Sequence, residues 1–283
     1  MRELQIQLAW NRLLAIVEEQ AQVLMRTAFS TVVREAGDLS AGIFSGDGEM
    51  LAQAVTGTPG HVNSMAESVK KFLKKYPIEE LEPGDVLLTN DPWDGTGHLN
   101  DFTVVTPVFL ETKCVCIFAS TSHIADVGGR GFGPDANDIF EEGLRVPIGF
   151  LLKRGVLDLT LMDLIKANVR DPQVAEGDLY SLMACNQAGS IELLVMLSDL
   201  GLQDLEELGR VILERSREAM RREIATLPEG AYEYEMTIDG YDEPVVIHCK
   251  MNIEGGNIVL DFDGSSGASS RGINVPLPYT VAY

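Results

Sequence analysis

The sequence predicts a mixed α+β protein with long helices, an antiparallel or mixed sheet, and a C-terminal antiparallel β region. Apolar residues recur with a period near 3.6 over long stretches, which is typical of amphipathic helices. Between and after these stretches lie short runs of β-branched and apolar residues bounded by Gly, Asp and Pro, which is typical of strands. The 283 residues are 45% hydrophobic, which is enough for a sizeable core.

The first elements are expected to be a long helix, a β-hairpin and a second helix. Residues 4–29 contain no Pro or Gly and place apolar residues on one helical face. Short strands are predicted at 39–44 and 50–54, because the intervening Ser-Gly-Asp-Gly sequence suits a tight turn. A helix is predicted over 63–76, and a short apolar strand is predicted over 85–89, directly after a Pro-Gly pair.

Two adjacent strands are predicted at 101–110 and 113–121, joined by a two-residue turn. Both stretches are apolar and rich in β-branched residues. In an antiparallel hairpin the start of the first strand lies beside the end of the second. His98 and Asp101 are therefore expected to meet His123, although they lie far from it along the chain.

A run of helices is predicted to follow the hairpin and a glycine-rich loop. Its members are expected at 159–168, 173–200 and 202–226. The last two are acidic and amphipathic and are joined at Gly201. Because a glycine commonly ends a helix, we expect these two to form a helical hairpin.

The pattern changes again after Gly230, where alternating stretches separated by Gly and Asp predict a small antiparallel sheet. Its strands are expected at 232–239, 245–252 and 257–262. We therefore divide the chain into an α+β domain that carries the metal site, residues 1–228, and the start of a second β-rich region, residues 229–283. The second region is expected to be truncated, since the chain stops within an apolar run.

Composition excludes several classes of partner. The net charge of −21 argues against nucleic acid, which requires a basic surface, and against an anionic membrane. The first residues lack the apolar core of a signal peptide, and no apolar run approaches the length that crosses a bilayer. Four cysteines in 283 residues do not form a disulfide scaffold. We expect a cytoplasmic protein with reduced thiols.

Two of the four histidines lie in neighbouring polar motifs that can converge on one metal ion. His98 is followed three residues later by Asp101, and His123 is followed at the same spacing by Asp126. Neutral imidazole and carboxylate groups suit a divalent cation such as zinc, manganese or iron. Each of these groups could instead be a satisfied polar core residue or a loop cap. The occurrence of two such motifs close together favours His98, Asp101 and His123 as metal ligands.

Several short blocks, in the same order along the chain, are similar to those of one protein family. They are residues 34–40 (REAGDLS), 59–65 (PGHVNSM), 90–93 (NDPW), 97–101 (GHLND), 122–129 (SHIADVGG), 142–147 (EGLRVP) and 167–170 (ANVR). They resemble the B-type, or large, subunit of the hydantoinase, 5-oxoprolinase and acetone/acetophenone carboxylase family. The family subunit is about twice as long, so the resemblance implies that this chain is its N-terminal half. Trp93 and Asn100 depart from the Tyr and Pro found in many members.

The resemblance implies a metal-dependent catalytic subunit of an ATP-dependent cyclic-amide hydrolase. In the family an ATP-binding A-type subunit phosphorylates the substrate, while the B-type subunit holds one divalent metal, so a hetero-oligomer is expected. Asp38 is the fourth metal ligand by family position; otherwise it is a turn or cap aspartate. A subunit of an ATP-dependent ketone (acetone or acetophenone) carboxylase is the first alternative. A non-catalytic assembly subunit is the second, since the abrupt end and the acidic helices also suit a scaffold.

Three further residues are candidates for acid–base chemistry. Asp126 could orient the His123 imidazole or act as a general base, or it could only shape a turn. His61 could contact substrate or metal, or it could simply begin a helix. Glu142 could transfer protons, although acidity near a helix N-terminus explains it equally well.

Four residues are candidates for binding a phosphorylated intermediate. Gly128 and Gly129 could let backbone N–H groups approach a phosphate, or they could belong to a merely flexible loop. Arg145 and Arg170 could pair with a phosphate or carboxylate, or with the many acidic groups of this chain.

Overall fold

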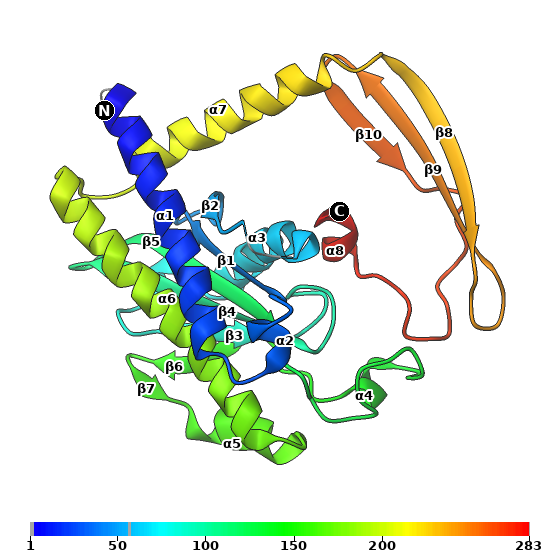
Figure 1. The fold of residues 1–283 in the computed structure, drawn as a ribbon, viewed down its shortest axis with the longest axis horizontal. Helices are drawn as coiled ribbons and strands as arrows, with labels where there is room; N and C mark the ends of the chain where they lie inside the picture. The colour runs from blue at the N-terminus through cyan, green and yellow to red at the C-terminus, as the bar shows by residue number, and fades with distance from the viewer. Residues whose placement is uncertain (1–2, 56–57, 283) are drawn as a thin grey trace. The chain divides into compact units, whose positions relative to one another are not determined.

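The structure is a computed structural model that describes residues 3–55 and 58–282 (Figure 1). The helices are α1 (Glu3–Thr27), α2 (Thr31–Arg34), α3 (Pro59–Lys75), a 3₁₀ turn η1 (Ile78–Glu80), α4 (Ile139–Glu142), α5 (Leu159–Asn168), α6 (Pro172–Leu200), α7 (Glu206–Ile224) and α8 (Leu277–Ala282). The strands are β1 (Leu39–Phe44), β2 (Met50–Gln53), β3 (Val86–Thr89), β4 (Asp101–Leu110), β5 (Lys113–His123), β6 (Gly149–Lys153), β7 (Val156–Leu157), β8 (Gly230–Ile238), β9 (Val245–Glu254) and β10 (Asn257–Asp261). The predicted α+β class is confirmed.

The chain folds into two compact units. The first contains the residues up to Gly209 together with those from Val275 on, and the second spans Arg210–Asn274. Most of α7 and the whole C-terminal sheet therefore belong to the second unit, whereas α8 belongs to the first.

A seven-stranded sheet forms the centre of the first unit. Its strand order is β2-β1-β5-β4-β3-β6-β7, and every neighbouring pair is antiparallel. The β4–β5 hairpin holds the middle positions, and its register pairs Asp101 directly with His123. The predicted hairpin is thus confirmed. Strand β5 runs two residues beyond its predicted end, so that His123 itself belongs to the strand.

Helices cover both faces of this sheet. This explains why β1, β4 and β5 are nearly continuous apolar runs and do not alternate between apolar and polar residues. On one face α1 and α6 pack side by side (Figure 1). There Gly189 of α6 has no room for a side chain, because a Cβ would lie 2.4 Å from the Phe118 ring. On the other face α3 packs through Met65, Val69 and Phe72 against a fully buried apolar cluster.

Two boundaries differ from the sequence prediction for physical reasons. Helix α3 begins at Pro59, four residues earlier than predicted, because proline at the first helical position loses no hydrogen bond and has a suitable φ. The earlier start brings His61 into the first turn. Helix α7 begins at Glu206 rather than 202. The reason is that α6 ends at Leu200, its cap residue Gly201 is in the left-handed region (φ 64°), and a short turn follows.

The second unit carries the three-stranded antiparallel sheet β10-β9-β8, close to the predicted strands. Alternate residues of β8 give this sheet one apolar face: Tyr232, Tyr234, Met236 and Ile238. Their partners on β9 continue that face with Met251, Cys249, Ile247 and Val245. The β8 side chains on this face are exposed, in contrast to the two-sided burial of the first unit.

Across the described residues, no helix combines the length and the apolar character that crossing a membrane requires.

Candidate metal centre

Three adjacent strands end at the same edge of the seven-stranded sheet, and each contributes a polar side chain there. Asp101 begins β4, and His123 ends β5 directly opposite it. Asp38 immediately precedes β1, and its carbonyl oxygen accepts a hydrogen bond from the His123 N–H at 3.2 Å. The antiparallel order β1-β5-β4 therefore gathers residues that are 22 to 85 positions apart in the chain.

Two further histidines reach this edge from outside the sheet. His98 lies in the loop before β4, and the His98 and His123 ring centroids are 5.1 Å apart. His61 comes from the first turn of α3, and its Nε2 lies 2.8 Å from Asp101 Oδ2. The structure thus brings together all four predicted ligands, together with His61.

The distances within this cluster fit a shared cation better than direct hydrogen bonds. His98 Nε2 lies 3.4 Å from Asp101 Oδ2, and His123 Nδ1 lies 3.5 Å from Asp101 Oδ1. Both separations exceed the usual hydrogen-bond range, which ends near 3.2 Å. Two ligand atoms on one tetrahedral zinc, each about 2.1 Å from the metal, lie about 3.4 Å apart. Donor atoms of His98, Asp101 and His123 all lie within 4.8 Å of one another.

Unpartnered buried atoms supply a second test of this fit. Asp101 is fully buried, yet its Oδ1 has no hydrogen-bond partner, and the same holds for Nδ1 of His61, His98 and His123. A buried polar atom without a partner costs about 1–3 kcal/mol, so a group of them in one place requires an explanation. Asp101 and His123 would be among the residues that hold a cation at this cluster, and the cation would give their unpartnered atoms a partner.

Asp38 lies at the margin of this group. Its Oδ2 is 4.0 Å from His123 Nδ1, and its Oδ1 is 3.6 Å from His61 Nδ1. The hydroxyl of Thr58 donates a hydrogen bond of 2.8 Å to Oδ1, which leaves Oδ2 directed toward His123. This arrangement is compatible with the fourth ligand that the family resemblance implies.

The electrostatics of the cluster favour the protonation states that ligation needs. Burial lowers the pKa of His98, and the attraction of Asp101 does not offset it, so this ring is neutral at physiological pH. Burial opposes ionisation of Asp101, but neighbouring His98 and contacts with His123 and His61 hold its pKa well below the usual range. Burial also opposes a charged His61, but hydrogen bonding to Asp101 outweighs it and raises the His61 pKa.

Thr96 holds the Asp101 carboxylate, and Thr121 in turn contacts Thr96. The Thr96 hydroxyl donates to Asp101 Oδ2 at 3.2 Å and lies 3.2 Å from the Thr121 hydroxyl. Thr121 stands two residues before His123 on β5, so strand periodicity places it on the same face, and this spacing could have revealed it. Thr96 carries no comparable signal, because it lies in an irregular loop.

The loop that carries His98 is fixed by Asn90 and by a close approach at Gly97. Asn90 donates to the carbonyl oxygens of Leu99 and Leu144 at 2.7 and 2.9 Å. Gly97 has φ +119°, and a Cβ there would lie 2.7 Å from the Tyr279 ring of α8. Glycine is therefore required both by the backbone conformation and by the space available next to His98.

Asp126 and Arg170 form a separate arrangement beside the cluster. The Asp126 carboxylate accepts hydrogen bonds from the N–H of Gly128, from the N–H of Arg170 and from the Arg170 guanidinium. The same guanidinium donates to the carbonyl oxygens of Gly128 and Gly129 at 3.3 and 2.6 Å. Among the described residues, no hydrogen bond or ion pair joins Asp126 to His123. The predicted role of Asp126, as a group that orients His123 or as a general base, therefore stays a prediction. The glycines present their carbonyl oxygens, not their N–H groups, to Arg170.

Glu142 and Arg145 lie on the segment that faces this loop. Burial, together with Asp138, raises the pKa of Glu142, which closes α4. Arg145 Nε lies 3.4 Å from Asp91 Oδ2. Within the described part of the chain no hydrogen bond or ion pair connects either side chain to the histidine cluster. Their predicted catalytic and phosphate-binding roles remain predictions.

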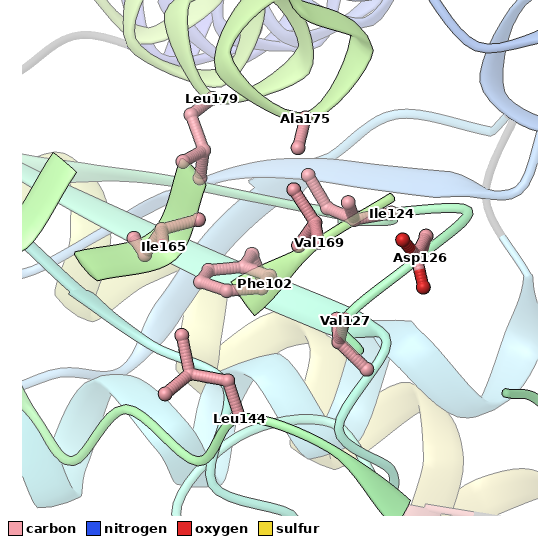
Figure 2. A pocket seen from close by; sticks show the side chains of 9 residues that line it. All are labelled: Phe102, Ile124, Asp126, Val127, Leu144, Ile165, Val169, Ala175 and Leu179. Carbon is pink, nitrogen blue, oxygen red and sulfur yellow. The ribbon is translucent and has the colours of Figure 1, made fainter. Parts of the chain in front are cut away.

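An apolar recess lies at Val127, the residue that leads into the glycine-rich loop (Figure 2). Val127, Phe102 and Leu144 line it together with residues of α5 and α6, and Asp126 stands at its edge. The recess is a packing junction that fastens the base of the loop to the body of the first unit.

These features define an α+β protein with a histidine–carboxylate cluster at the edge of an antiparallel sheet. The chain belongs to the hydantoinase B/oxoprolinase family, whose sequence model matches residues 2–283. A related protein of unknown role from Methanocaldococcus jannaschii is 33% identical over 276 residues, which are 94% of this chain and 48% of that protein.

Two solved structures share the fold. The ATP-dependent caprolactamase from Pseudomonas jessenii matches 100% of this chain and 49% of its own, with a TM-score of 0.92 and 23% identity. Nucleotide-free acetone carboxylase matches 99% of this chain and 40% of its own, with a TM-score of 0.90 and 19% identity. At these identities the likeness establishes the fold alone. The chain spans about half the length of the Methanocaldococcus jannaschii protein and of the caprolactamase.

Proposed function

We propose that this chain is the metal-holding part of an ATP-dependent enzyme that hydrolyses a cyclic amide, acting with an ATP-binding partner subunit. The observation that carries the proposal is the convergence of His98, Asp101 and His123 around unpartnered buried atoms. Membership of the hydantoinase B/oxoprolinase family supports the class of reaction. The fold shared with a lactamase that depends on ATP supports the use of that nucleotide.

His98, Asp101 and His123, with Asp38, would hold one divalent cation such as zinc, manganese or iron. When bound, such a cation polarises a carbonyl oxygen or makes a water molecule more acidic. The groups offered are two imidazoles and two carboxylates, a set that suits these metals.

The surrounding residues keep the donor set in place. Thr96 and His61 both engage Asp101 Oδ2, which leaves Oδ1 free to face His123. Thr58 fixes Asp38 in the same manner. His61 holds a proton at Nε2 against Asp101, because its raised pKa keeps the ring charged at a pH where an ordinary histidine is half neutral. That proton increases the stability of the buried carboxylate.

A ketone carboxylase subunit is the second candidate, because the fold is shared equally well with acetone carboxylase. The same residues would hold the cation, which would supply charge stabilisation in that reaction rather than acidification of water. The residues of the cluster serve either reaction, so the substrate must be determined by assay.

The test is ATP consumption by the complex of this chain with an ATP-binding partner subunit of the family. Hydantoin, 5-oxoproline, ε-caprolactam, acetone and acetophenone are offered separately, each with and without bicarbonate. We expect turnover of a cyclic amide that is independent of bicarbonate, and its loss in His123→Ala but not in the control variant His248→Ala. Bicarbonate-dependent turnover of a ketone would select the carboxylase. A stable complex with no turnover of any substrate would indicate an assembly subunit.

A metal measurement accompanies the assay. If the purified chain binds no divalent metal, and His123→Ala leaves partner-dependent turnover unchanged, the proposal is wrong.

A further inference from the structure

An exposed aromatic side chain lies against the two histidines of the candidate centre. Phe132 is 72% exposed, yet its ring centroid is 5.4 Å from that of His98 and 5.2 Å from that of His123. The ring meets His123 edge-on, at an interplanar angle of 89°, and is tilted by 58° against His98. These distances and angles are those of favourable aromatic contacts. Phe132 therefore packs against both histidine rings while most of its own surface stays exposed to solvent.

The base of the loop that carries Phe132 is fixed. A Cβ at Gly128 would lie 2.3 Å from the Asn168 carbonyl oxygen, and one at Gly129 would lie 2.4 Å from the Glu142 backbone. The Arg170 guanidinium binds both glycine carbonyl oxygens, and Val127 packs in the apolar recess (Figure 2). The base thus sets where the loop leaves the body of the first unit.

The tip of the loop has more room than its base. Gly131 has φ +90°, and a Cβ at Gly131 or at Gly133 would meet no heavy atom within 4 Å. Phe132 sits between these two glycines. A large apolar ring on a flexible tip, anchored at a rigid base, can stay over the histidines or move aside to admit a ligand.

The charged groups near the loop indicate which ligand that would be. Arg130 pairs with Glu141 at 3.1 Å, Arg145 with Asp91 at 3.4 Å, and Arg170 with Asp126 at 2.7 Å. Each arginine of the loop and of the segments that fasten it is therefore already neutralised by a carboxylate. A substrate with a free carboxylate, such as 5-oxoproline, would have to displace one of these ion pairs, whereas an uncharged lactam would not.

We propose that Phe132 is a specificity-determining residue that covers the His98–His123 side of the candidate centre and contacts the hydrocarbon part of an uncharged lactam. The inference rests on the proposed function, since it assigns a substrate class to the same site. An apolar cover over a metal centre excludes water and lowers the local dielectric, which strengthens interactions of the substrate with the centre.

The cover is tested first on the chain alone, without metal or substrate. Diethyl pyrocarbonate modifies neutral, accessible imidazoles, and mass spectrometry gives a separate rate for each histidine. His248 of the second unit, with a side chain 11% exposed like that of His123, is the internal reference. We expect Phe132→Ala to raise the rates at His98 and His123 about five-fold relative to His248. Phe132→Leu should raise them less.

The matched control is Phe140→Ala, which removes an 83% exposed phenylalanine from α4 on the neighbouring segment. It should leave all four rates unchanged. Equal histidine rates in the wild-type chain and in Phe132→Ala would show that the ring covers nothing and would overturn the inference, whatever the chain binds or catalyses.

The substrate contact is tested on the complex with its partner subunit. We expect Phe132→Ala to raise KM for ε-caprolactam about ten-fold, with kcat changed less than three-fold, and we expect the wild-type kcat/KM to favour ε-caprolactam over 5-oxoproline. An unchanged KM, or a preference for 5-oxoproline, would contradict the assigned substrate class. If the wild-type complex turns over no cyclic amide, the proposed function and with it the substrate assignment fail, while the labelling rates still decide whether Phe132 is a cover.

Discussion

Histidine meets carboxylate on an antiparallel strand in both compact units, but the two arrangements differ in what they leave unsatisfied. In the second unit His248 has a partner at each ring nitrogen: Glu233 at 2.8 Å from Nε2 and the Asp263 carbonyl oxygen at 2.7 Å from Nδ1. In the first unit, His123 Nδ1 is buried without a hydrogen-bond partner and lies 3.5 Å from Asp101 Oδ1, which also has none. Nδ1 of His98 is likewise buried and unpartnered. A contact between histidine and carboxylate is thus not by itself evidence of a metal site. The evidence is a set of buried donor atoms that converge and have no hydrogen-bond partner.

The difference has a cause in the architecture. The seven-stranded sheet is covered on both faces, so polar groups at its edge are withdrawn from water and need a compensating partner. The three-stranded sheet has an exposed apolar face. On its polar face His248 has partners at both ring nitrogens, from Glu233 on β8 and from Asp263 in the loop after β10. If this contrast is correct, equivalent substitutions in the two units should have unequal effects.

The largest expected effect is that of removing the central charge. Asp101→Asn preserves the shape of the side chain but removes the anion shared by three histidines. We expect the affinity for Zn²⁺ or Mn²⁺ to fall by at least about 100-fold, since the carboxylate is itself a ligand. Isothermal titration calorimetry on the metal-free chain measures the change. The matched variant Glu233→Gln removes the carboxylate beside His248 and should leave the metal affinity unchanged. Equal losses of metal affinity in Asp101→Asn and Glu233→Gln would contradict the difference between the two units.

The next effect is that of His61, which supports Asp101 without lying among the converging donors. Replacing it with leucine removes the 2.8 Å contact with Asp101 Oδ2 and leaves this buried oxygen to Thr96 alone. Substitutions of such supporting partners typically cost 10–100-fold in metal affinity, and we expect a loss of about that size. The same titration measures it, with His248→Leu as the control. A His61→Leu chain with wild-type affinity would remove His61 from the account.

The sequence predicted the parts of this centre that depend on strand order, and missed the parts that depend on irregular backbone. His98, Asp101 and His123 could be brought together because the hairpin at 101–110 and 113–121 was evident and antiparallel pairing fixes which ends meet. The contact between His61 and Asp101 could not be predicted in this way. It depends on a helix that begins at Pro59, four residues before the predicted start.

The environment of the glycine-rich loop was also beyond the sequence. Asp126 and Arg170 are 44 residues apart, and nothing in the local pattern links a residue that follows β5 to one that precedes α6. The sequence pattern does not single out Phe132, because one aromatic residue in a glycine-rich stretch carries no periodic signal. Its contact with the histidines depends on the path of a loop in which Gly128, Gly129 and Gly131 have φ > 0, a path that the sequence pattern does not specify.

A smaller effect is expected at the base of this loop. Arg170→Gln removes the contacts with Asp126, Gly128 and Gly129, but the arginine side chain is 63% exposed, so the loss of stability should be less than about 1 kcal/mol. The loop itself should open more often, and limited proteolysis between 126 and 133 should become several-fold faster. Arg210→Gln, which removes an exposed ion pair with Glu214, is the control. Unchanged cleavage would show that the recess alone fixes the loop.

The smallest effect concerns the pH response of the second unit. The hydrogen bond with Glu233, followed by that with the Asp263 carbonyl oxygen, raises the pKa of His248 above its ordinary value of 6.5. A raised folded-state pKa means that this contribution to stability is complete below pH 6.5 and is lost as the pH rises through the folded pKa. An NMR titration of the His248 ring should give a midpoint above 6.5 that Glu233→Gln moves back toward that value. A midpoint at or below 6.5 in the wild-type chain would contradict this reading.

The most direct test of the account is to locate the cation. Crystals of the chain grown with one equivalent of zinc or manganese are measured at the absorption edge of the metal, and elemental analysis gives the stoichiometry. We expect one ion per chain and one strong anomalous peak about 2.0–2.2 Å from donor atoms of His98, Asp101 and His123. A stoichiometry near zero, or a peak elsewhere on the molecule with none at this cluster, would contradict the central claim.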